Sequence, residues 1–257
     1  MSGSIASLYV HPVKGFTPQR VDDASLSAGR AFPGDRLFAV EDGPCGFDPA
    51  APSFIPKQRF AVLAKEAAVA QVATHYNLSS GVLAATAPGQ ADFHGAIGEQ
   101  QGESAFSAWF SGAMAHLLGS NAGGPYRLIA GGGHRFLDHP LGHVSVLNLA
   151  SVADLAQRLG RPIDPLRFRA NVLVKGWAPW VELGWEGKRV RLGGAETRVF
   201  KPIVRCAATE VDPASAARDI AIPAELHRLY GHVLMGIYVQ VVEGGEVRRG
   251  DAAQLIG

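Results

Sequence analysis

Residues 189–211 read RVRLGGAETRVFKPIVRCAATEV, and this stretch decides the fold class. Short runs with β-branched and apolar residues recur in it, at 189–192, 196–200 and 205–211. Each run has the length of a strand, and glycine and proline lie between the runs instead of a helical pattern. The stretch therefore predicts neighbouring β-strands, with Cys206 at the start of the third.

Working outward, most of the remaining chain is also rich in short strands. Strand-like runs occur at 4–10, 37–40, 69–76, 82–86, 126–129, 171–174 and 236–242. Helical spacing of apolar residues is confined to 103–118, 149–159 and a short run at 223–229, and Asn148 or Ser151 can cap the second helix. Strands without regular alternation with helices predict a mainly β protein with a few helices (α+β) that is β-barrel-like.

A loose segment at 119–125 divides this pattern. It follows the first strong helix and contains glycines, an asparagine and a proline, which are typical of a boundary. We therefore expect a β-rich N-terminal region over residues 1–120, which ends in that helix, and a barrel-like domain over residues 121–257.

Composition excludes several classes of protein. The chain has 257 residues, of which 47% are hydrophobic and 18% charged, with a net charge of +1. A nucleic-acid-binding protein is expected to be more basic and to carry a recognisable module, so we expect no nucleic acid polymer as partner. No apolar run has the length of a membrane span and the N-terminus shows no secretory signal, so we expect no membrane association and a cytoplasmic location.

Cys206 is the most suggestive single residue. Arg205 beside it favours the thiolate form, and a thiolate is a soft ligand suited to soft metals. Two alternatives remain open from the residues alone, namely a small buried side chain and a nucleophile whose histidine base lies elsewhere in the sequence. Cys45, in a glycine- and proline-containing loop, has no comparable context.

Arginines near 167–171 form a second candidate. In an extended segment Arg167 and Arg169 would point to the same face, and the predicted helix start at 148–151 would lie nearby. Two guanidinium groups with a helix N-terminus make an anion site, whereas the alternative is a surface cluster of salt bridges.

Three histidines, His134, His139 and His143, fall in one glycine-rich loop. No recognised zinc-ligand spacing accompanies them, so we interpret the segment as a polar loop, and a role near a substrate entrance stays open.

In their order along the chain, these motifs resemble the MOSC-domain family with the N-terminal β-barrel region that often precedes it. Its members include the mitochondrial amidoxime-reducing component and bacterial N-hydroxylaminopurine reductases. His11 stands where a tyrosine is usual in the family. The resemblance is carried by HPVKG at 11–15, GDR at 34–36, NLAS at 148–151, RFRAN at 167–171, PIVRC at 202–206, VDP at 211–213, GIY at 236–238 and GD at 250–251.

The resemblance implies a molybdenum–pterin cofactor (molybdenum-molybdopterin) with Cys206 as the protein ligand to the metal and the catalytic residue. It implies reduction of N-hydroxylated or N-oxide small molecules, with electrons from a separate donor protein or reductase. A cofactor carrier or sulfur-transfer protein and a non-catalytic binding module are the alternatives. The cofactor-binding residues implied are Lys14, Gly15, Arg36, Asn148, Ser151, Arg169, Asn171, Arg205 and Tyr238.

Overall fold

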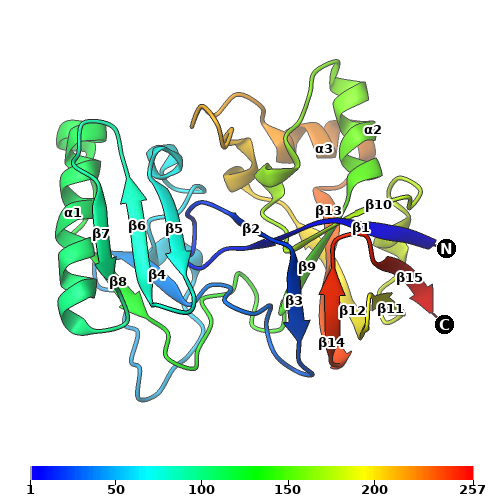
Figure 1. Ribbon diagram of the computed structural model, residues 1–257. Coiled ribbons are helices and arrows are strands. Elements are labelled where there is room, and N and C mark those ends of the chain that lie inside the picture. Colours follow the sequence, from blue (N-terminus) through cyan, green and yellow to red (C-terminus); the bar gives the residue numbers. More distant parts are fainter. Residues whose placement is uncertain (1, 257) are drawn as a thin grey trace.

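A seven-stranded closed β-barrel dominates the computed structural model, which describes residues 2–256 (Figure 1). All neighbouring pairs in the ring are antiparallel except β9 and β10, and β10 closes the ring by pairing with β1. The mainly β fold class with few helices is thereby confirmed. Around the ring the strands are β1 (Ser2–Val10), β10 (Val172–Lys175), β9 (Val144–Asn148), β13 (Leu234–Glu243), β12 (Ala195–Val204), β11 (Arg189–Leu192) and β15 (Ala252–Ile256).

Alternating burial explains why these residues form a barrel. In β11, Val190 and Leu192 are fully buried while Arg189 and Arg191 point outward, as the two-residue period of a strand requires. Gly193, with φ +55°, allows the tight turn from β11 into β12.

The first strand of the chain lies in the barrel that the C-terminal half builds. β1 pairs with β10 on one side and with β15 on the other, and β2 (Gln19–Val21) extends the sheet beyond β1. β3 (Asp23–Leu26) pairs with β14 (Gly245–Arg248). The N-terminal strands thus cross the division at residue 120, and that division stays a prediction.

A second lobe contains the remaining strands and the longest helix. β4 (Phe38–Asp42) pairs with β8 (Tyr126–Ala130), and a three-stranded sheet consists of β5 (Ala73–Asn77), β6 (Val82–Thr86) and β7 (Phe93–Ala96). Helix α1 (Gln100–Leu118) packs on β7 and β8. It buries Phe106, Phe110 and Met114 in the core of this lobe, at the helical spacing that the sequence predicts.

Two further helices cover one end of the barrel (Figure 1). Helix α2 (Leu149–Leu159) begins at Asn148, whose side chain accepts a hydrogen bond from the Ala150 amide, and Gly160 ends it in the left-handed conformation. Helix α3 (Ile222–Tyr230) packs on the same small core. Short 3₁₀ helices fill the connections: η1 (Lys57–Arg59), η2 (Ala67–Gln71), η3 (Gly119–Asn121), η4 (Pro165–Phe168), η5 (Val181–Gly184) and η6 (Ala207–Glu210).

Three sequence predictions are wrong in local structure. Residues 69–71 belong to η2, so only the end of the predicted strand at 69–76 is extended. The predicted strand at 205–211 is absent: β12 ends at Val204 and η6 follows. The segment at 167–169 is not extended either, because Pro165 starts η4 there and Arg169 adopts a left-handed conformation with φ +51°.

No helix among residues 2–256 combines the length and the apolar character that crossing a membrane requires.

Candidate functional site

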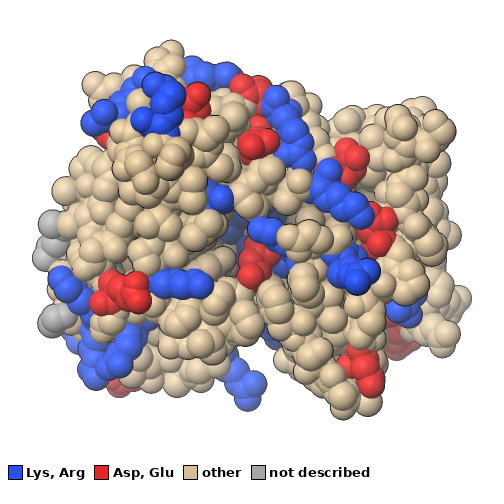
Figure 2. Space-filling model, turned by 180° about the vertical axis from the view of Figure 1, so that it is seen from behind, with Lys and Arg blue, Asp and Glu red and all other residues tan. Residues whose placement is uncertain are grey.

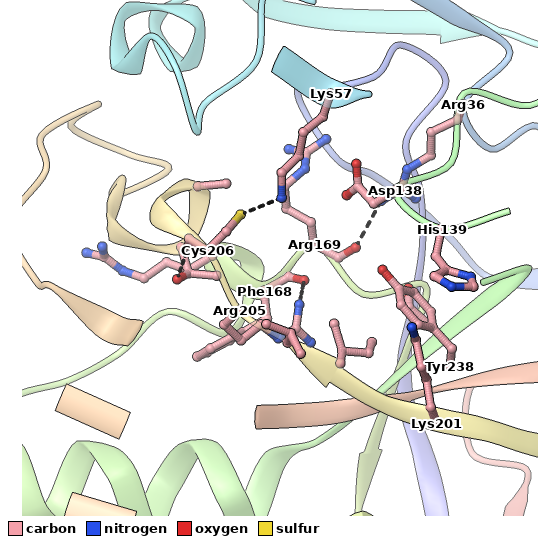
Figure 3. Close-up of a pocket in the computed structure, with 16 residues that line it drawn as sticks. Arg36, Lys57, Asp138, His139, Phe168, Arg169, Lys201, Arg205, Cys206 and Tyr238 are labelled. Atoms are coloured by element: carbon pink, nitrogen blue, oxygen red, sulfur yellow. Dashed lines mark hydrogen bonds between the residues drawn. The ribbon is translucent and has the colours of Figure 1, made fainter. Parts of the chain in front are cut away.

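A basic pocket of about 270 Å³ lies where loops of the second lobe meet the end of the barrel (Figure 3). Its walls come from segments far apart in the sequence: the turn before β4, η1, the loop between β8 and β9, the end of η4, strands β12 and β13, and the turn into η6. Its lining residues are Arg36, Lys57, Asp138, His139, Ser145, Arg167, Phe168, Arg169, Lys201, Ile203, Val204, Arg205, Cys206, Ala208, Thr209 and Tyr238.

Cys206 enters the pocket directly after β12. It precedes η6, and its carbonyl accepts hydrogen bonds from the amide and the hydroxyl of Thr209 at 3.0 and 2.9 Å, which fix the turn. The Lys57 ammonium donates to the Cys206 sulfur at 3.0 Å (Figure 3). Burial would lower the pKa of Lys57, but this hydrogen bond and the nearby charges of Cys206 and Asp138 together outweigh burial and raise that pKa. Sequence reasoning missed Lys57, because no motif connects it to Cys206.

Arg169 presents an unpaired guanidinium nitrogen to the pocket. Asp164 accepts a hydrogen bond from the Leu166 amide at 2.8 Å and begins η4, and the left-handed Arg169 ends it. Among the described residues, Arg169 Nη2 is buried without a hydrogen-bond partner. Burial, together with the nearby Arg36, lowers the pKa of Arg169 to about 9. A buried cationic donor without a partner is costly unless an anion joins it.

Arg205 is held by backbone carbonyls beside Cys206. Its Nε donates to Met235 O at 2.8 Å and its Nη1 to Phe168 O at 2.9 Å, while Nη2 is buried without a partner in the described chain. Burial lowers the pKa of Arg205 to about 10. Among residues 2–256, three guanidinium groups that line this pocket, those of Arg167, Arg169 and Arg205, each keep a buried nitrogen without a hydrogen-bond partner.

Arg36 is fixed by a buried network behind the pocket. Its guanidinium pairs with Asp35, lies 3.0 Å from His11 Nδ1 and donates to Arg169 O at 3.3 Å. Burial would raise the pKa of Asp35, but Arg36 and His11 outweigh it and hold that pKa at about 2. Burial and the charge of Arg36 lower the pKa of His11 to about 3, so His11 is neutral at physiological pH.

This buried histidine predicts a specific acid sensitivity. Unfolding returns His11 to an ordinary pKa near 6.5, so its contribution to stability is complete above about pH 6.5 and is lost as the pH falls toward 3. Between pH 4.5 and 6.5, His11→Gln should flatten the pH dependence of the unfolding free energy by up to about 1.4 kcal/mol per pH unit. Urea denaturation at a series of pH values measures this slope. His94→Gln, at an exposed position on β7, should leave the slope unchanged, and an unchanged slope in His11→Gln would contradict a buried neutral imidazole.

Among residues 2–256, Asp138 is the one carboxylate that lines the pocket. It accepts from Lys14 Nζ at 2.5 Å, and its side chain is 46% exposed. Desolvation by the surrounding pocket walls would raise its pKa, but the positive charges of Lys14 and Arg36 hold the pKa well below its usual range. Tyr238 also lines the pocket, and burial, assisted by the charge of Asp138, raises its pKa to about 12. The pocket thus offers a permanent carboxylate and a protonated phenol.

The structure brings most of the predicted site residues together. Arg36, Arg169, Arg205, Cys206 and Tyr238 line the pocket itself. An adjoining recess that shares Arg36, Lys57, Asp138, Arg169 and Cys206 with the pocket adds Lys14 and Gly15, and a smaller recess that shares Arg36, Asp138, Ser145 and Tyr238 adds Asn171.

Asn148 and Ser151 lie outside these recesses. Both side chains donate to the buried Glu182, at 2.8 and 2.9 Å, and Asn148 also caps α2. The helix start predicted as part of the anion site is therefore occupied by a carboxylate of the chain itself. Arg167 is engaged as well, because it pairs with Asp212 and Asp219 at 2.6 and 2.8 Å.

The three loop histidines separate in space. His139 lines the basic pocket, whereas His134 and His143 line a separate cavity of about 700 Å³ on the other side of the loop. Within residues 2–256, no three histidine, cysteine or acidic side chains lie together in a way that could hold a metal ion.

Positive charge dominates the pocket, since six lysines and arginines line it with one carboxylate. Figure 2 shows the face seen from behind, where blue side chains and a few red ones meet near the furrow between the two lobes. A soft sulfur ligand, with the Arg169 and Arg205 nitrogens that have no partner in the described part of the chain, fits a metal-bearing cofactor with an anionic group. Guanidinium groups match phosphate oxygens in charge and geometry.

Comparison with known proteins identifies the family. The family described as MOSC domain matches residues 133–254, and the family described as MOSC N-terminal beta barrel domain matches residues 2–116. The chain is a MOSC-domain protein. The resemblance predicted from the sequence is therefore confirmed.

Two curated relatives of this MOSC-domain protein are amidoxime-reducing components. Mitochondrial amidoxime-reducing component 1 of Mus musculus is 31% identical over 124 residues, which are 44% of this chain and 36% of that protein. Mitochondrial amidoxime reducing component 2 of Bos taurus is 29% identical over 120 residues, which are 42% of this chain and 35% of that protein. The matches thus span little more than a third of each relative. Among solved structures, the YUAD protein from Bacillus subtilis is 16% identical with a TM-score of 0.47, over 98% of this chain and 94% of that one.

Proposed function

We propose that this MOSC-domain protein binds a molybdenum–pterin cofactor through Cys206 and reduces N-hydroxylated or N-oxide small molecules. One observation carries the proposal: Cys206 lines the same pocket as Arg169 and Arg205, each of which has a buried guanidinium nitrogen without a partner among residues 2–256. The names of the curated relatives support amidoximes as a substrate class.

The residues divide into two roles toward the cofactor. Cys206 would supply the protein ligand to the metal, and Arg169 and Arg205 would bind the phosphate of the pterin with their free donors. Lys14, Gly15 and Arg36 would line the pterin side of the recess. When bound, molybdenum would supply two-electron redox chemistry, so that with two electrons from the donor and two protons from solvent the oxygen of the N–O group would leave as water.

The polar side chains around Cys206 would orient the substrate. The phenol of Tyr238 stays protonated at physiological pH and would donate a hydrogen bond to the substrate, while Asp138 stays ionised and would accept one. An N-hydroxylated amidine or base carries both a donor and an acceptor, so these two groups match its two ends. The side chains of Ile203 and the exposed Val204 give the pocket an apolar wall, which an aromatic or alkyl substituent of the substrate would contact.

Metal analysis and turnover test this function. Protein made in a host that synthesises the molybdenum cofactor should contain about one molybdenum and one pterin per chain. It should reduce an amidoxime with reduced methyl viologen as donor. A cofactor carrier or sulfur-transfer protein would bind the metal without turnover, and a non-catalytic binding module would bind none.

Electron supply provides a further expectation. The sequence contains neither a dinucleotide-binding glycine motif nor the cysteine cluster of an iron–sulfur centre. We therefore propose a separate electron-donor protein or reductase as partner. The purified chain should reduce the substrate with reduced methyl viologen but not with NADH alone, and comparable rates with the two donors would contradict this expectation.

A further inference from the structure

We propose that Lys57 is a positioning residue of the reaction site. Its ammonium group holds the Cys206 sulfur and places a fixed positive charge beside it, so that a loop of the N-terminal half tunes the sulfur that the barrel presents. This inference rests on the proposed function, because a metal bound through Cys206 gives the contact its chemical consequence.

The contact joins distant parts of the chain. Lys57 Nζ lies 3.0 Å from Cys206 Sγ across 149 residues of sequence, and Lys57 lines both the pocket and the adjoining recess. Asp138 is the nearby carboxylate, but Lys14 already donates to it at 2.5 Å. The Lys57 ammonium is therefore directed at the sulfur (Figure 3).

The backbone that carries Lys57 is well fixed. Arg59 N donates to Pro56 O at 3.0 Å and Phe60 N to Lys57 O at 3.1 Å, which close the η1 turn. Phe60 is fully buried, and its ring packs edge-on against Phe136 with centroids 5.6 Å apart. Lys57 is thus three residues from a core side chain, unlike a lysine on a free surface loop.

Arg218 ties this segment to the turn of Cys206. Its Nη2 donates to Leu63 O at 2.6 Å, and its Nη1 donates to Ala207 O at 2.7 Å. One guanidinium group therefore bridges the chain that follows Lys57 and the residue that follows Cys206. The bridge keeps the two ends of the Lys57–Cys206 contact together.

A cation that donates to a ligand sulfur changes the metal that the sulfur holds. Hydrogen bonds to a thiolate withdraw charge from it, weaken its donation and raise the reduction potential of the centre. Lys57 would therefore make the bound metal easier to reduce. It would act through Cys206.

Charge-selective alkylation tests the contact in cofactor-free protein. In a Cys45→Ser background, the rate of Cys206 alkylation by the anionic reagent iodoacetate is divided by the rate with the neutral reagent iodoacetamide. Both reagents attack the thiolate, so the ratio of the two rates cancels the amount of thiolate and reports the local charge. Lys57→Gln should lower this ratio about fivefold, the effect of one unit charge about 4 Å away in a water-like medium.

Two variants serve as controls. Lys57→Arg keeps the positive charge and should restore most of the ratio. Lys201→Gln removes another cation of the same pocket, whose ammonium lies over the Phe200 ring at 5.4 Å, and should change the ratio less than twofold. An unchanged ratio in Lys57→Gln would overturn the contact.

Redox titration of cofactor-loaded protein tests the consequence. Lys57→Gln should shift the molybdenum potential to more negative values and alter the Mo(V) resonance spectrum, and Lys57→Arg should reverse most of the shift. An unchanged potential in Lys57→Gln would overturn the role toward the metal. Wild-type protein without molybdenum would overturn the proposed function and this role together, while the alkylation ratio would still decide whether Lys57 holds the sulfur.

Discussion

Replacing Cys206 with serine should lower the rate of amidoxime reduction by more than about 100-fold. Removing only the hydrogen-bonding partners of a metal ligand already lowers activity or metal affinity by about 10- to 100-fold. A hydroxyl is a harder and poorer ligand than a thiolate for molybdenum in a sulfur environment. The substitution is nearly isosteric and Cys206 is only partly buried, so the unfolding free energy should change by less than about 1 kcal/mol. X-ray absorption at the molybdenum edge should show one sulfur neighbour fewer.

Cys45→Ser is the matched control. Cys45 is buried beside strand β4, where the Glu41 carboxylate accepts from the Cys45 amide at 3.1 Å, and Cys45 lines none of the recesses around Cys206. The control should keep both turnover and the absorption spectrum of the wild type. Normal turnover with unchanged sulfur coordination in Cys206→Ser would remove the basis of the proposed mechanism.

Local patterns in the sequence predicted the elements whose causes are local. Helix α2 has the predicted bounds because Asn148 caps it, Gly160 ends it and apolar residues recur at helical spacing between them. The strand predicted at 205–211 failed for the opposite reason. The ladder between β12 and β13 ends at Val204, and the residues that follow form η6. Pairing with another strand, which the local sequence does not encode, decides where β12 ends.

The candidate site shows the same limit. Motifs near Cys206 and Arg169 predicted a cofactor site through family resemblance, but the arrangement of charge around these residues depends on contacts between distant segments. Lys57 and Asp138 reach the pocket from two loops whose sequences carry no ligand motif. The helix start at Asn148 matched an anion site in sequence, whereas Glu182, 34 residues away, fills that position in space.

Arg169→Ala should weaken cofactor retention about tenfold or more, since charged hydrogen bonds to a phosphate contribute about 1.5 to 3 kcal/mol. Fold stability should stay unchanged or rise, because the substitution removes a cation whose Nη2 is buried without a partner in the described chain. Arginine and alanine both carry a Cβ, so backbone strain at φ +51° does not enter the comparison. Molybdenum and pterin content after gel filtration, together with thermal unfolding of the cofactor-free protein, measures both quantities.

Arg167→Ala should give the reverse pattern and so separates binding from folding. Arg167 is two residues away and nearly fully buried, but its guanidinium is neutralised by Asp212 and Asp219. Removing it leaves two partly buried carboxylates without their shared cation, which should lower the unfolding free energy by about 2 kcal/mol. The folded fraction should still retain the cofactor, because Arg169 and Arg205 keep their free donors. Full molybdenum and pterin content in Arg169→Ala would show that the anion binds elsewhere, and equal loss of stability in the two variants would show that Arg169 serves the fold.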